Sequence, residues 1–172
     1  MRKPDGATGR DSFPVSLEVR DYECDLQGIV NNAVYLHYLE HARHQYLRAH
    51  GLSFAELTKT GVHLVVIQME IEYRLPLRSG DQFLVTSRLE QVSIVRFAFL
   101  QEIVRLTPPV KPLEDGMSSP RGKRTVPRAC PGGSTGDRRA VAARARVVCA
   151  AMDTTGKPIR PTVLDPLFQT TR

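Results

Sequence analysis

Alternating apolar and polar positions predict β-strands along most of the chain. Residues 15–22 place Val15, Leu17 and Val19 on one face and mainly polar side chains on the other, the period-two pattern of a half-buried strand. The same pattern predicts strands over residues 62–74, 82–90, 94–105 and 141–152, with a short sixth strand over 158–163. Turn-forming prolines and glycines separate several of these segments. We therefore expect a mainly antiparallel sheet.

Two of these strands carry more detailed expectations. An unbroken pleat over residues 62–74 places one apolar set on a single face: Val65, Ile67, Met69, Ile71 and Tyr73. Residues 94–105 are apolar on both faces. Because a soluble monomer seldom leaves a large apolar face in water, the second face indicates burial against another subunit.

One long helix interrupts the strands. Apolar and aromatic side chains recur at helical spacing from residue 33 to 49. Asn31 or Asn32 can cap its start, and Gly51 suits its end. Ser53 and Glu56 match a capping box, which predicts a short second helix over residues 54–58. The helix and the strands have similar lengths, so the expected architecture is α+β, with an antiparallel sheet layered on the helix.

The chain length of 172 residues suits one domain. We expect a disordered basic tail over residues 1–12 and a single domain over residues 13–168. Residues 107–139 hold six of the twelve prolines and show no hydrophobic periodicity. This composition predicts a disordered, dispensable insertion inside the domain.

The net charge of +6 does not indicate a nucleic-acid surface. Residues 1–10 carry three basic residues against one acidic, and residues 107–139 carry seven against three, so the remainder is neutral. We expect no nucleic-acid partner. No apolar run is long enough to cross a bilayer, and three scattered cysteines do not suit a disulfide framework. A reducing, cytoplasmic compartment is the default expectation.

The densest polar cluster lies between the first strand and the long helix. Asp25 precedes the helix by a few residues, and the free N–H groups of a helix N-terminus favour negative charge. Gly28 allows a tight turn or a close approach to a ligand. Acyl transfer needs this pairing of a carboxylate with donors for a developing oxyanion. The alternative is that Asp25 only stabilises the loop or caps the helix.

The run Asp25-x-x-Gly28-Ile-Val30-Asn31-Asn32-x-x-Tyr35, with Leu75–Asp81 further on, resembles hotdog-fold thioesterases of the 4-hydroxybenzoyl-CoA thioesterase type. The resemblance covers about residues 15–106 and 140–163, and it is especially similar to the plant and cyanobacterial acyl-ACP thioesterase branch. It implies a curved antiparallel sheet wrapped around a central helix. It also implies a homodimer or homotetramer with sites at the subunit interface.

The resemblance further implies a cofactor-free enzyme that hydrolyses acyl-CoA or acyl-ACP to the free acid and thiol. Asp25 would be nucleophile or general base, and the backbone N–H groups of Asn32 and Ala33 would hold the oxyanion. The residues expected to bind the substrate are Gly28, Val30, Asn31, Tyr35 and Val66. Where the acyl-ACP branch often has a second acidic residue, this chain has Gln68, which can orient water but cannot act as a general base.

The sequence leaves three alternatives open. One is hydrolysis of 1,4-dihydroxy-2-naphthoyl-CoA, and another is a non-catalytic acyl-binding module. The third is a zinc protease, because His37, Glu40 and His41 match an H-x-x-E-H pattern. A mostly β chain without an evident third ligand disfavours that last reading, so we expect no metal.

Overall fold

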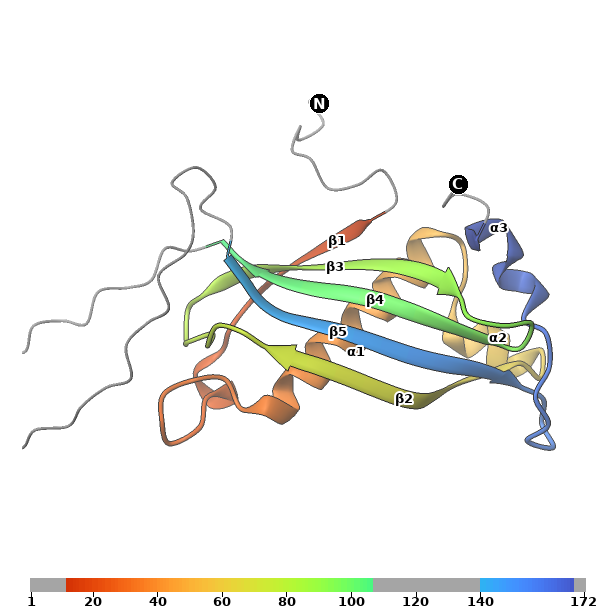
Figure 1. Ribbon diagram of the computed structural model, residues 1–172, viewed down its shortest axis with the longest axis horizontal. Helices are drawn as coiled ribbons and strands as arrows, with labels where there is room; N and C mark the ends of the chain where they lie inside the picture. The colour runs from red at the N-terminus through yellow and green to blue at the C-terminus, as the bar shows by residue number, and fades with distance from the viewer. Residues whose placement is uncertain (1–11, 107–139, 169–172) are drawn as a thin grey trace, which may run out of the picture.

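Five antiparallel strands form one sheet, and a long helix packs against one of its faces (Figure 1). The computed structural model describes residues 12–106 and 140–168, so nearly all of the predicted tail and the whole of the predicted insertion lie outside the described residues. The strand order is β1-β3-β4-β5-β2. The strands are β1 (Phe13–Glu18), β2 (His63–Tyr73), β3 (Gln82–Gln91), β4 (Arg96–Arg105) and β5 (Ala140–Met152), and the helices are α1 (Asn32–Ala49), α2 (Phe54–Lys59) and α3 (Asp165–Phe168).

The core lies between α1 and the inner face of the sheet. Large core side chains of β3 and β4 are at most 2% exposed there, and each contributes roughly 1.5–3 kcal/mol by burial. The helix contributes an aromatic-rich stripe at the predicted spacing. The stripe consists of Tyr35, Tyr38, Leu39, Ala42, Tyr46 and Leu47, and it packs with Phe83, Val85, Phe97, Phe99 and Ile103. The predicted α+β architecture is confirmed.

The predicted helices form, with one difference at a cap. The side chain of Asn31 accepts a hydrogen bond from the backbone N–H of Ala33, so Asn31 is the N-cap of α1. Helix α2 begins at Phe54, yet the Ser53 side chain makes no capping bond. The predicted capping box is therefore wrong, although the helix that it indicated is present.

Two strand predictions are corrected, one at its end and one as a whole. Strand β1 stops at Glu18, and Asp21–Glu23 form a 3₁₀ turn, because the Glu23 carboxylate and N–H both bond back to Arg20. The sixth strand over 158–163 does not form: Pro158 makes one bridge to Met152, and a 3₁₀ turn follows at Thr162–Leu164. Prolines 158 and 161 lack the N–H groups that a strand ladder requires.

A β-bulge in β2 overturns the predicted face assignment. The register with β5 shifts between Val66 and Gln68. The extra residue reverses the face of the sheet on which the following side chains lie. Leu64 and Met69, five positions apart, both pack against the core. Val65 and Ile67, expected to share a face with Met69, are instead 40% and 42% exposed.

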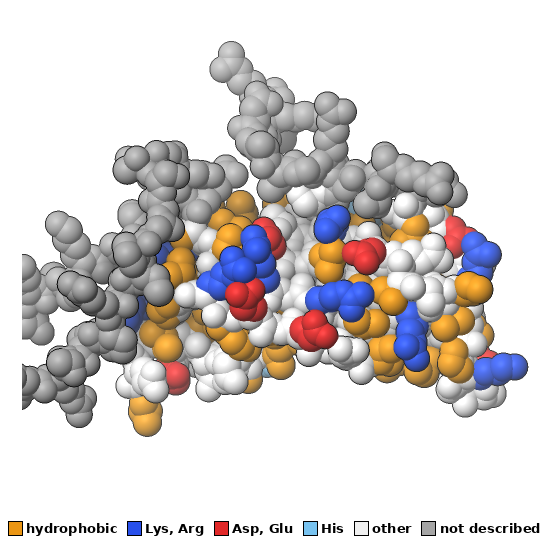
Figure 2. All heavy atoms as spheres, in the orientation of Figure 1, with side chains coloured by type: hydrophobic (Ala, Val, Ile, Leu, Met, Phe, Trp, Pro, Cys, Tyr) orange, Lys and Arg blue, Asp and Glu red, His pale blue; other side chains and the backbone are white. Residues whose placement is uncertain are grey.

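The outer face of the sheet mixes charges of both signs, as Figure 2 shows from the side on which the sheet lies in front of α1. Arg144 of β5 pairs with Glu102 of β4 at 2.7 Å. On the expected second apolar face of residues 94–105, Ala98 is fully buried between its register neighbours Glu90 and Val148, whereas Ile94, which precedes β4, is 70% exposed. Within the described ranges, no helix is both long and apolar enough to span a membrane.

Candidate active site

The loop before α1 is a tight hairpin held by its own backbone. Cys24 and Val30 form an antiparallel bridge. Inside it, Asp25 N–H donates to the Ile29 carbonyl at 2.8 Å, and Gly28 N–H donates to the Asp25 carbonyl at 2.9 Å. Gly28 has φ +70°, a left-handed conformation that costs other residues roughly 1–2 kcal/mol. The role expected of Gly28 as a turn residue is confirmed.

The Asp25 side chain is exposed at the start of this hairpin. One carboxylate oxygen, Oδ1, accepts a 2.8 Å hydrogen bond from the Gln27 N–H. This bond orients the side chain and stabilises the turn, which is the structural role that the sequence left open. It uses only one of the two carboxylate oxygens, so the structural role is compatible with a chemical one.

The first turn of α1 lies directly after the hairpin. Asn31 Oδ1 accepts from Ala33 N–H at 2.9 Å, and the Asn31 carbonyl accepts from Val34 N–H at 2.9 Å. The Ala33 donor is therefore occupied by the cap. Among the described residues, no acceptor is found for the Asn32 N–H, which makes it the first-turn donor available to an oxyanion.

Val30 and Tyr35, expected to line an acyl pocket, belong to the core. They are 4% and 3% exposed. The Val30 N–H donates to the Leu77 carbonyl at 2.9 Å, and the Tyr35 hydroxyl accepts from the Leu77 N–H at 3.2 Å. Burial, the largest influence, raises the pKa of Tyr35. Both residues thus stabilise the loop from the buried side through their bonds to Leu77.

Gln68 and Val66 lie apart from this loop within one chain. Both are exposed residues of β2, and Gln68 Nε2 donates to Glu70 at 2.7 Å. The end of β2 does reach the site, since the Tyr73 hydroxyl donates to the Asn32 carbonyl at 3.1 Å. Gln68 is five residues earlier, or about 17 Å along the strand. A single chain therefore does not bring Gln68 to Asp25.

Sequence reasoning missed a buried carboxylate beside the loop. Glu23 is 8% exposed, and its Oε2 accepts from the Tyr38 hydroxyl at 2.6 Å and from the Arg20 N–H at 2.7 Å. Burial opposes ionisation of Glu23, but these hydrogen bonds outweigh it and hold the pKa below its ordinary value. The Glu23 carbonyl also accepts from the Asn31 N–H. The polar cluster between the first strand and the long helix pointed to this region, but the sequence does not show which of its carboxylates is buried.

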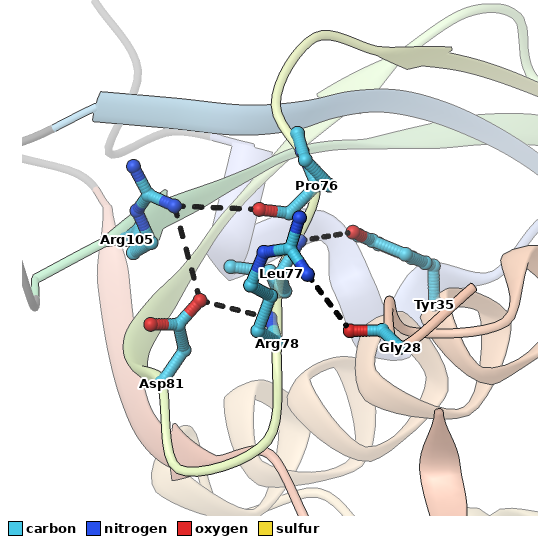
Figure 3. Close-up of polar contacts among 7 residues, drawn as sticks. All are labelled: Gly28, Tyr35, Pro76, Leu77, Arg78, Asp81 and Arg105. Atoms are coloured by element: carbon cyan, nitrogen blue, oxygen red, sulfur yellow. Dashed lines mark hydrogen bonds and ion pairs between the residues drawn. The ribbon is translucent and has the colours of Figure 1, made fainter. Parts of the chain in front are cut away.

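Leu75–Asp81, which the sequence marked as a turn and as part of the family resemblance, packs directly against the hairpin (Figure 3). The Asp81 carboxylate accepts from the Arg78 N–H at 2.9 Å and lies 3.9 Å from the Arg105 guanidinium. Arg78 in turn donates to the Gly28 carbonyl at 3.3 Å. Arg78, Asp81 and Arg105 have no individual signal in the sequence, because only the fold brings them together.

The histidine pattern on α1 does not form a metal cluster in this chain. His37, Glu40 and His41 are all exposed on the helix surface. Within residues 12–106 and 140–168, no three His, Cys, Asp or Glu side chains lie close enough together to hold a metal ion.

A family model for the thioesterase-like superfamily matches residues 19–168 of the chain. The chain belongs to this superfamily. The matched range contains the Asp25 hairpin, α1 and all of β2, β3, β4 and β5. The resemblance stated from the hairpin motif is thereby confirmed.

Curated relatives in this superfamily include enzymes from plants and bacteria. The chain is 41% identical over 102 residues to a chloroplastic acyl-acyl carrier protein thioesterase of Arabidopsis thaliana, an alignment covering 59% of this chain and 54% of that protein. The chain thus spans about half the length of this relative. It is 33% identical over 101 residues to the long-chain acyl-CoA thioesterase FadM of Escherichia coli, covering 59% of this chain and 75% of FadM.

Solved structures confirm the hotdog fold. A hypothetical protein from Aquifex aeolicus superposes with a TM-score of 0.67 at 25% identity, covering 90% of this chain and 98% of that one. A 1,4-dihydroxy-2-naphthoyl-CoA thioesterase from Synechocystis superposes with a TM-score of 0.69 at 18% identity, covering 93% and 97%. At that identity, the second likeness concerns the fold alone.

Proposed function

We propose that this protein is a thioesterase that hydrolyses an acyl-CoA or acyl-ACP to the free acid and thiol. The observation that carries the proposal is the placement of the Asp25 carboxylate on a rigid hairpin beside the N-terminus of α1, in a chain of the thioesterase-like superfamily. A carboxylate and a backbone oxyanion donor are the two groups that acyl transfer to water requires.

In the proposed reaction, the thioester carbonyl oxygen accepts a hydrogen bond from the Asn32 N–H. Asp25 removes a proton from water as the water oxygen attacks the carbonyl carbon, and the negative charge on the carbonyl oxygen is stabilised at the helix start. Collapse of the intermediate breaks the C–S bond, and the thiolate takes up a proton. Direct attack by Asp25 would instead form an acyl-enzyme anhydride, which water then hydrolyses.

A substrate panel tests this proposal. The full chain is incubated with straight-chain and aromatic acyl-CoAs, including 1,4-dihydroxy-2-naphthoyl-CoA, and with acyl-ACPs, and released thiol is measured with a colorimetric reagent. We expect enzyme-dependent thiol release with at least one acyl carrier. Binding of acyl-CoA without any thiol release would contradict the enzyme and favour the acyl-binding module.

We also propose that the enzyme assembles as a homodimer or a homotetramer. Strand β2 is at the edge of the sheet and exposes Val65, Val66 and Ile67 to 40%, 44% and 42%. An exposed apolar edge strand favours pairing with another chain. Pairing along the whole of β2 would extend the interface to Tyr73, whose hydroxyl contacts the Asn32 carbonyl at the site.

Light scattering tests the assembly. We expect a mass of at least twice 19.2 kDa, and a shift toward the monomer in Ile67→Lys, where a charge is placed on the edge. An active wild-type species of 19.2 kDa would contradict the interface.

For the compartment, we propose a cytoplasmic or plastid-like location. The free thiols of Cys24 and Cys149 support a reducing environment.

A further inference from the structure

We infer that Tyr35 is a positioning residue of this site, whose hydroxyl holds the Leu77 peptide and through it fixes the Asp25 hairpin relative to α1. This inference rests on the proposed function, because it assigns a role in the same reaction. It replaces the expected role of Tyr35 as part of an acyl pocket.

Leu77 connects two segments through its own backbone. Its N–H donates to the Tyr35 hydroxyl at 3.2 Å, and its carbonyl accepts from the Val30 N–H at 2.9 Å. Leu77 is fully buried, and Tyr35 and Val30 are almost so. Because water does not readily replace a bond at such a depth, both bonds must be kept for the local structure to persist.

The two segments carry different parts of the proposed machinery. Tyr35 is in the first turn of α1, which also presents the Asn32 N–H, whereas Val30 closes the hairpin that presents Asp25. Leu77 therefore ties the oxyanion donor and the carboxylate to one common point. A displacement of about 1 Å between such groups can lower a rate by roughly a hundredfold.

The turn that carries Leu77 is itself fixed on both sides (Figure 3). Asp81, 4% exposed, accepts from the Arg78 N–H, and Arg105 donates to the Pro76 carbonyl at 3.4 Å. The Arg78 guanidinium adds a second tie to the hairpin at the Gly28 carbonyl. The turn is thus held in place from both sides, and the Tyr35 hydroxyl is the group of α1 that bonds to it.

Tyr35→Phe tests the inference, because it deletes one hydroxyl and keeps the ring that packs edge-on against Tyr73 at 5.2 Å. We expect kcat to fall about tenfold with KM changed less than about twofold, since geometry rather than substrate contact is altered. The substrate is whichever acyl-CoA of the panel the wild type hydrolyses fastest. Tyr46→Phe, at the far end of the same helix, is the matched control and should leave both constants unchanged.

Hydrogen exchange gives a readout independent of activity. In Tyr35→Phe, the amides of Leu77 and Val30 should exchange at least about tenfold faster, while those of β4 and β5 keep their wild-type protection. If Tyr35→Phe does not fold, Arg78→Gln, an exposed substitution, should still lower kcat and speed exchange at Val30.

Different results would contradict the inference about Tyr35 and the proposed function. Wild-type kcat and unchanged Val30 exchange in folded Tyr35→Phe would overturn the inference, and a raised KM with unchanged kcat would return Tyr35 to the acyl pocket. A wild type without thioesterase activity contradicts the proposed function, while the Val30 exchange rates still decide whether the bridge exists.

Discussion

Tyr38 of α1 donates a 2.6 Å hydrogen bond from its hydroxyl to the buried carboxylate of Glu23. The bond joins the helix to the segment that leads into the Asp25 hairpin. Burial and this bond both raise the pKa of Tyr38 above its ordinary range. Together with the bonds from Arg20, it keeps Glu23 ionised inside the protein.

Glu23→Gln should destabilise the fold in a pH-dependent manner. The folded-state pKa of Glu23 lies below the ordinary 4.5, so its stabilisation is complete above that pH and is lost as pH falls through the folded value. At neutral pH we expect the free energy of unfolding to fall by about 1–3 kcal/mol. Urea titrations at successively lower pH should show the free energies of unfolding of the wild type and Glu23→Gln coming closer together. Exposed Glu90→Gln is the control, and an equal loss at every pH would contradict the ionised state.

Gln101 is expected to be required for stability because it is a hydrogen-bond partner of a buried cation. Arg43, 5% exposed, donates to Gln101 Oε1 at 3.1 Å, and burial lowers its pKa. No carboxylate of the described residues pairs with it. Gln101→Leu should therefore destabilise the fold by about 3 kcal/mol, measured by urea unfolding. Exposed Gln91→Leu should change stability by less than about 0.5 kcal/mol; a similarly small change in Gln101→Leu would show that Arg43 does not depend on this residue.

Residues 107–139 are expected to be dispensable for the fold. Arg105 and Ala140 are register partners of adjacent strands, so a short hairpin connection can join β4 to β5. Replacing Pro112–Arg138 with a short Gly/Ser linker should leave the thermal midpoint and thiol release nearly unchanged. A large drop in either would mean that the segment packs on the domain or contacts the substrate.

Much of the fold could be predicted because local pattern and global structure agree. Alternation located four of the five strands closely, and helical spacing together with Asn31 located α1. The β2 bulge could not be read, because Val65, Val66 and Ile67 are all apolar and suit either face. The sixth strand failed because two prolines outweighed an apolar pattern.

The candidate site was predicted only where it is local in sequence. Asp25, Gly28 and Asn31 lie within one hairpin and cap, so their spacing carried the information. The residues behind them come from distant segments, as in the bond from Leu77 to Tyr35 across 42 positions. Such contacts depend on how the turn packs against the helix, which no periodicity encodes.

The role proposed for Asp25 is tested by the kcat of Asp25→Asn in the thiol-release assay. Asn keeps the size of the side chain and an oxygen for the Gln27 N–H, but it removes the charge. Asp153→Asn is the matched control, because Asp153 caps an exposed turn in the same way, accepting from Thr155 N–H at 2.8 Å. We predict that Asp25→Asn lowers kcat at least about a hundredfold at an unchanged thermal midpoint, while Asp153→Asn keeps wild-type activity. A folded Asp25→Asn protein with wild-type kcat would show that the Asp25 carboxylate does not take part in the reaction.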